Sequence, residues 1–138
     1  MSKIKTILLS LILLFSSQIA QASDSGPEVL GVLFYADWCG SCKVLEPAIE
    51  KARESADFDN SSFLLVRLDL TDAKKSHQSR LMSHALALNE LYHKNAGATG
   101  YMLLVNAETK DIISRITAMS DAKAIASQIK EAIFKASS

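Results

Sequence analysis

The chain lacks an excess of charge of either sign, because 15 Lys and Arg residues balance 15 Asp and Glu residues. A basic surface for nucleic acid or for an anionic membrane is therefore not expected. Internal repeats, low-complexity tracts and a second long apolar segment are also missing. With 138 residues, the chain is long enough for one domain with one core but not for two.

The N-terminal segment has no apolar run long enough to span a bilayer. The run Ile7–Phe15 is about nine residues long, whereas about 20 are needed. Lys3 and Lys5 precede this run, and Ala20-Gln21-Ala22 follows it with small residues at the usual cleavage positions. These three parts predict a secretory signal peptide that is cleaved after Ala22.

Cleavage would remove residues 1–22 and leave a single domain over residues 23–138. We expect this domain to be exported to the periplasm, to be monomeric and to have no stable membrane insertion. An uncleaved membrane anchor is the alternative interpretation of the same segment.

Only two cysteines are present, and they lie two residues apart in Trp38-Cys39-Gly40-Ser41-Cys42. A bridge that closes so short a loop removes little entropy from the unfolded chain, and small exported domains that depend on disulfides usually carry several. A helix that begins here, after the apolar run Val29–Tyr35, would stabilise a thiolate at Cys39 through its free N–H groups and its dipole. The pattern favours thiol–disulfide exchange, with a metal site or an inert structural bridge as alternatives.

Hydrophobic periodicity predicts the element order β-α-β-α-β-β-α, in a central mixed sheet with helices on both faces. The expected strands are Val29–Tyr35, Phe63–Leu70, Tyr101–Val105 and Asp111–Ile116. The expected helices are Cys39–Phe58, a second that begins near Leu81 and stops near Asn95–Gly97, and a third that Ser120 caps. Their expected apolar faces are Leu45, Ile49, Ala52 and Ala56 in the first, Leu81, Ala85, Leu88 and Leu91 in the second, and Ile125, Ile129 and Ile133 in the third.

Two further features complete the expected pattern of elements. Thr71–Gln78 is polar and is expected to form a loop. Pro47 lies inside the first helix and should bend it, because proline lacks the N–H group and its ring crowds the preceding turn.

This order of elements, with Trp38-Cys39-Gly40-Ser41-Cys42 after the first core strand and Pro47 further along, resembles the thioredoxin family. The resemblance covers roughly Pro27 to Phe134 and implies a thioredoxin-like α/β fold with thiol–disulfide oxidoreductase activity. The segment Tyr35–Glu46 is most similar to the C-terminal thioredoxin-like domain of DsbD, which slightly favours reduction over oxidation or isomerisation. The resemblance implies no cofactor beyond the Cys39–Cys42 pair. The implied partners are protein thiols or disulfides and a redox partner protein.

Two positions depart from the pattern of that family. Leu33 stands six residues before Cys39, where the family usually has a buried Asp. Met102 is expected where the family has a cis-proline opposite the active-site disulfide, with Gly100 as the less favoured alternative. Because a cis bond is costly before any residue other than proline, a trans bond is expected here.

The expected catalytic residues are Cys39, Cys42 and Glu46. Cys39, at the exposed helix start, would be the nucleophile, and Cys42, one turn further in, would resolve the mixed disulfide. Glu46 lies four residues after Cys42 on the same helix face and could accept its proton in place of the acid missing at Leu33. A solvated surface glutamate is the alternative for Glu46.

The expected substrate-contacting residues are Trp38, Gly40, Ser41, Tyr101 and Met102. No metal site is predicted, and His77, His84 and His93 are interpreted as polar surface residues. The alternative function is a soft-metal module, in which the cysteines and Met102 bind an ion such as Cu(I), or a partner-binding domain without redox turnover.

Overall fold

The structure is a computed structural model that describes residues 26–55 and 58–138. The predicted signal peptide and its cleavage site lie outside these residues. The strands are β1 (Val29–Tyr35), β2 (Phe63–Asp69), β3 (Tyr101–Asn106) and β4 (Ile112–Thr117). The helices are α2 (Gly40–Glu54), α3 (Ala73–Ala85), α4 (Asn89–Asn95) and α5 (Ala122–Ala136), with a short 3-10 turn η1 (Asn60–Ser62) before β2. Within the described ranges, no helix is both long enough and apolar enough to cross a membrane.

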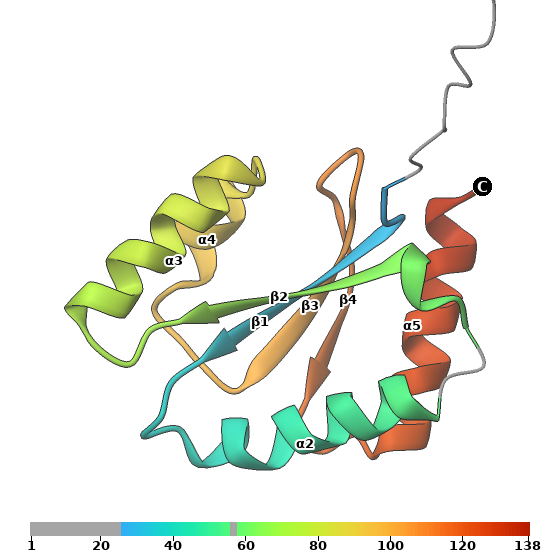
Figure 1. The fold of residues 1–138 in the computed structure, drawn as a ribbon, viewed down its shortest axis with the longest axis horizontal. Coiled ribbons are helices and arrows are strands. Elements are labelled where there is room, and N and C mark those ends of the chain that lie inside the picture. The colour runs from blue at the N-terminus through green and yellow to red at the C-terminus, as the bar shows by residue number, and fades with distance from the viewer. Residues whose placement is uncertain (1–25, 56–57) are drawn as a thin grey trace, which may run out of the picture.

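The four strands form one mixed sheet in the order β2-β1-β3-β4. β1 and β2 run parallel, whereas β3 is antiparallel to both of its neighbours, β1 and β4. A parallel pair needs a crossover, which α2 supplies, and an antiparallel pair needs only the short turn that joins β3 to β4. Helices α2 and α5 cover one face of the sheet and α3 and α4 cover the other, as Figure 1 shows. The predicted thioredoxin-like α/β fold is confirmed.

β1 is the central strand and is buried on both faces, which explains its continuous apolar sequence. Val29 and Leu33 face the cluster under α2 and α5, and Leu30 and Phe34 face the cluster under α3 and α4. Gly31 leaves room for the Phe63 ring, which would have to shift if a side chain were added, because a Cβ there would lie 2.5 Å from it. Both helical layers therefore pack against one rigid strand that leads directly into the cysteine motif.

The helix after β1 is shorter than predicted, because it ends at Glu54 and not at Phe58. Phe58 still packs at the margin of the core. Pro47 lies within α2 as expected, and the bend it should cause stays a prediction. The last helix is capped by Asp121 and not by Ser120, because the Asp121 carboxylate accepts the backbone N–H of Ala124 at 2.8 Å.

The second helical region differs most from the prediction. The polar stretch expected to be a loop instead forms the first half of α3, which Asp72 caps by accepting the N–H of Lys75. The inward face of α3 is made by Ser79 and Ser83, whose hydroxyls donate to backbone carbonyls. Leu81 is exposed, so the apolar periodicity that we used to predict this helix does not describe its buried face.

A break divides the predicted second helix into α3 and α4. Ala87 adopts φ +56°, which ends the first helix. Leu88 and Leu91 are buried, as predicted, but Leu88 is the N-cap of the second, shorter helix and Leu91 lies within it.

Candidate active site at the start of α2

Cys39 and Cys42 form a disulfide, with their Cα atoms 5.3 Å apart. β1 ends at Tyr35, and a turn closed by the Cys39 N–H and the Ala36 carbonyl leads into α2. Cys39 is the N-cap residue of α2, and its Sγ accepts the backbone N–H of Cys42 at 3.2 Å. The disulfide therefore lies at the positive end of the helix dipole, where a thiolate at Cys39 is stabilised.

The two sulfurs have different surroundings. Cys39 is 7% exposed, less than a freely exposed helix start would give, whereas Cys42 is fully buried. The Cys42 Sγ lies 3.7 Å from the Phe34 carbonyl oxygen. When reduced, the Cys42 thiol can donate to that carbonyl, which favours its protonated form. The geometry thus favours a thiolate at Cys39 and a thiol at Cys42.

Gly100, and not Met102, is the residue that faces the disulfide. A Cβ on Gly100 would lie 3.3 Å from the Cys39 Sγ and 2.7 Å from the Ser41 Cβ. Its backbone N–H donates to the Phe34 carbonyl at 2.9 Å, and its φ of +89° favours glycine. The less favoured sequence alternative is therefore the one found. No peptide bond among the described residues is cis.

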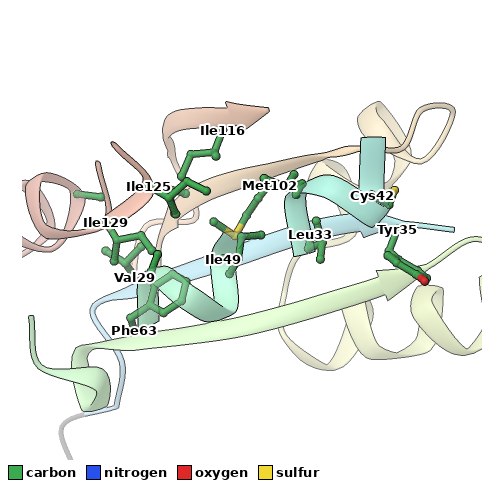
Figure 2. Packing of buried hydrophobic residues seen from close by; sticks show 14 of the residues in the cluster. Val29, Leu33, Tyr35, Cys42, Ile49, Phe63, Met102, Ile116, Ile125 and Ile129 are labelled. Atoms are coloured by element: carbon green, nitrogen blue, oxygen red, sulfur yellow. The ribbon is translucent and has the colours of Figure 1, made fainter. Parts of the chain in front are cut away.

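Met102 and Tyr101 lie in β3 and are buried away from solvent. Met102 pairs with Leu33 of β1, and Figure 2 shows its side chain in the cluster with Leu33 and Ile49. The Tyr101 ring stacks on Phe34 in the cluster on the opposite face of the sheet. The expectation that these two side chains contact substrate is corrected, because strand pairing turns both into the core.

Leu33 is also fully buried, in the same cluster as Cys42, so the position of the missing acid is apolar. Glu46 is partly exposed, and its carboxylate is paired with the Arg67 guanidinium at 2.8 Å. That guanidinium also lies over the Tyr35 ring, 3.5 Å from its centre. The structure therefore places Glu46 one turn beyond Cys42 and shows Arg67 as its partner.

The turn before Cys39 is held by a polar network that the sequence did not indicate. The Asp37 N–H donates to the Thr71 hydroxyl at 2.9 Å, and the Trp38 indole N–H donates to the Thr71 carbonyl at 3.1 Å. Lys75 pairs with Asp37 at 2.8 Å and with Asp69 at 3.3 Å. These segments lie far apart in the sequence, so no local pattern could have revealed their contact.

The network perturbs the pKa of each of its charged groups. The hydrogen bond from Lys75 is the main cause of the lowered pKa of Asp37. Burial opposes ionisation of Asp69, but hydrogen bonds from Thr71 and Lys75 outweigh it and lower the pKa. The same contacts, Asp37 first, raise the pKa of Lys75. All three groups are therefore held in their charged forms.

The remaining predicted positions lie at the surface. The Trp38 side chain is 66% exposed, and Gly40 and Ser41 are exposed beside the disulfide. His77, His84 and His93 are all exposed, as predicted. Among the residues that the structure describes, no group of three or more His, Cys, Asp or Glu is placed to hold a metal ion.

The sequence matches the family described as Thioredoxin over residues 14–85, just over half of the chain, including both cysteines. It is 47% identical over 45 residues to mitochondrial thioredoxin-2 of Schizosaccharomyces pombe, covering 33% of this chain and 32% of that protein. It is 34% identical over 58 residues to a thioredoxin of Ictalurus punctatus, covering 42% of this chain and 54% of that protein.

A third relative is much longer. The chain is 43% identical over 54 residues to a peptide-N(4)-(N-acetyl-beta-glucosaminyl)asparagine amidase of Caenorhabditis briggsae, covering 39% of this chain and 8% of that protein. The matches to these three relatives therefore span about half or less of each relative's length.

Proposed function

The chain belongs to the thioredoxin family, and from that premise we propose that it is an oxidoreductase that exchanges disulfides with protein thiols through Cys39 and Cys42. The observation that carries the proposal is the position of the disulfide at the N-terminus of α2. There the Cys39 sulfur accepts a helix N–H while Cys42 is fully buried. This asymmetry separates an attacking sulfur from a resolving one.

Reduction of a substrate would proceed in two exchanges. The Cys39 thiolate attacks one sulfur of the substrate disulfide, forms a mixed disulfide, and releases the other substrate sulfur as a thiolate. Cys42 then loses its proton and attacks the Cys39 sulfur, which releases the second substrate thiolate. The substrate gains two electrons, and the enzyme ends with the Cys39–Cys42 disulfide. The same steps in reverse would oxidise a dithiol.

The second step needs a group that takes the proton from Cys42. We assign this role to Glu46, since Leu33 offers no carboxylate and Glu46 lies one helical turn beyond Cys42. The ion pair with Arg67 would hold the carboxylate near this end of the helix. Glu46→Gln should therefore slow resolution of the mixed disulfide more than its formation.

Exposed apolar side chains beside the cysteines provide a surface for protein partners. Trp38 and Val44 project from the turn and the first part of α2. Val44 and Met119 line a shallow depression of about 450 Å³ between α2 and the β4–α5 loop. Such an exposed apolar surface suits protein substrates and a redox partner protein.

The finer assignments are part of the same proposal. We propose export to the periplasm on the signal-peptide pattern of residues 1–22, action as a monomer, and reduction as the favoured direction on the similarity of Tyr35–Glu46 to DsbD-type domains. The soft-metal alternative takes Met102 as a ligand beside the cysteines, and we do not favour it because the Met102 sulfur lies against Gly31, 2.9 Å from where a Cβ on that glycine would be.

The decisive experiment combines a redox titration with a trap. The metal-free protein is equilibrated with a glutathione series, and Cys42→Ala is incubated with oxidised protein substrates, with Cys39→Ala as the matched control. We expect a potential between about −270 and −120 mV and a mixed disulfide with Cys42→Ala only. A pair that resists reduction below about −300 mV, together with an empty trap, would show a structural bridge instead.

A further inference from the structure

We propose that Thr71, in the loop between β2 and α3, is a positioning residue that holds the turn Asp37-Trp38 in place for disulfide exchange. This role rests on the function proposed above. Two bonds carry it directly, from the Asp37 N–H to the Thr71 hydroxyl and from the Trp38 indole N–H to the Thr71 carbonyl. One residue thus binds both the backbone and the side chain of the turn that precedes Cys39.

The Thr71 hydroxyl both accepts and donates a hydrogen bond in this arrangement. Its oxygen accepts from Asp37 while its hydrogen is donated to the Asp69 carboxylate at 2.5 Å. The Thr71 backbone N–H donates to the same carboxylate at 3.0 Å. These three bonds together restrict the side-chain rotamer of Thr71 and fix its backbone to the end of β2.

The loop that carries Thr71 is anchored to the fold on both sides. Asp69 ends β2, and its carbonyl accepts the hydroxyl of the buried Ser79 at 2.8 Å. Asp72 caps α3, and Lys75 ties the Asp69 carboxylate back to Asp37. The anchor for the turn therefore comes from the sheet and from α3, and not from the exposed turn itself.

The turn determines where the reactive sulfur lies. Residues 36–39 connect β1 to α2, and Cys39 is the N-cap of that helix. Exchange needs the attacking, central and leaving sulfurs aligned, so a small displacement of the nucleophile lowers the rate. Trp38 is the exposed side chain next to Cys39, and its bond to Thr71 limits where the indole can lie when a partner binds.

The test compares Thr71→Val, which keeps the shape and removes the hydroxyl, with Thr71→Ser, which keeps the hydroxyl. Trp38 is the single tryptophan of the chain, so fluorescence excited selectively at tryptophan, and not at the three tyrosines, reports on this turn alone. We expect Thr71→Val to lower the rate of exchange with oxidised insulin about tenfold. Thr71→Val keeps the carbonyl that binds the indole but frees the segment that carries this carbonyl from Asp37 and Asp69. Acrylamide quenching of Trp38 in the reduced protein should therefore rise, by up to about 1.5-fold because the indole is already 66% exposed. Thr71→Ser should retain both native values.

Thr109→Val is the matched control. Like the Thr71 hydroxyl, the Thr109 hydroxyl accepts a backbone N–H, in this case from Asp111 at 3.3 Å. It lies in the β3–β4 turn, at the opposite end of the sheet from the disulfide, since β3 pairs antiparallel with β1. This variant should change neither readout. Lys75→Met provides a second break in the same network if Thr71→Val does not fold.

Each outcome decides a separate point. Native quenching and a native rate in Thr71→Val and Lys75→Met would overturn the proposal, as would equal loss in Thr71→Val and Thr71→Ser. Raised quenching with a native rate would show that Thr71 holds Trp38 but does not position exchange, which also overturns the proposal. A native protein that exchanges no disulfide would refute the proposed function, while the quenching comparison would still test whether Thr71 holds the turn.

Discussion

Gly100→Ala is the sharpest test of the geometry around the disulfide. The new Cβ would lie 2.7 Å from the Ser41 Cβ and 3.3 Å from the Cys39 Sγ, and side-chain carbons do not approach to the first of these distances. It would also force an L-residue to adopt φ +89°. Left-handed strain costs about 1–2 kcal/mol and overpacking about 1–3 kcal/mol, so the free energy of unfolding should fall by about 2–5 kcal/mol.

The assay is urea unfolding of the oxidised protein, followed by far-UV circular dichroism. With a denaturant slope of about 2 kcal/mol/M, the middle of the range for a small protein, the unfolding midpoint should fall by roughly 1–2.5 M. Gly97→Ala is the matched control in the same loop, because a Cβ there meets nothing within 4 Å. Its effect should stay within about 0.5 kcal/mol.

A second substitution separates the two causes of the loss. Ser41→Gly removes the atom that the new methyl group at position 100 would meet, so in the Gly100→Ala background it should restore about 1–3 kcal/mol. Alone, Ser41→Gly should cost up to about 1 kcal/mol, since glycine weakens a helix. Equal effects of Gly100→Ala and Gly97→Ala, or no coupling with Ser41, would refute the placement of Gly100 against the disulfide.

Three further predictions concern other parts of the fold. Leu33→Asp should destabilise the protein by about 3–5 kcal/mol at pH 7, because its carboxylate would be buried without a partner. In urea titrations this loss of stability should shrink at lower pH, where the carboxyl is protonated, whereas the loss caused by Leu33→Asn should not change with pH. Ala87→Gly should raise the free energy of unfolding by about 0.5–1 kcal/mol, because glycine adopts the φ of +56° found there without strain, and no change in the midpoint would contradict this. The pKa values of Asp37 and Asp69 are lower in the folded protein than in the unfolded chain, so their ion pairs with Lys75 stabilise the fold above about pH 4, the pKa of a carboxyl in the unfolded chain. This stabilisation is lost as the pH falls through the lower pKa values of the folded state. Lys75→Met should therefore flatten the fall in the urea midpoint below about pH 4, and an acid limb as steep as the native one would count against the pairing.

The spacing of apolar residues predicted the helices and strands that bury an apolar face, and it failed to predict an element whose buried face is polar. β1 was predicted with its observed bounds, because a strand buried on both faces has a continuous apolar sequence. The first half of α3 was missed, because its inward face consists of serines that satisfy their own hydroxyls. No hydrophobic pattern marks such a helix, and Asp72 was the only local signal that could have located its start.

The site was predicted in part. The cysteine pair at the start of a helix follows from spacing and from the strand that precedes it, although the helix was predicted to include Cys39, which the structure places one residue earlier as the N-cap. Met102 was preferred over Gly100 because spacing alone does not show where a loop ends and a strand begins. The antiparallel register pairs Met102 with Leu33 and so turns it into the core.

Local sequence specifies what depends on neighbouring residues: the C-x-x-C spacing, the strand that leads into it, and the helix whose first turn can stabilise a thiolate. Tertiary structure specifies what depends on contacts between distant segments. It brings Gly100 against the Cys39 sulfur, pairs Glu46 with Arg67, and joins the turn before Cys39 to Thr71. These contacts arise only when strand register and helix packing bring the segments together. The chemistry of this protein can therefore be inferred from one short stretch, whereas the positioning of that chemistry requires the whole fold.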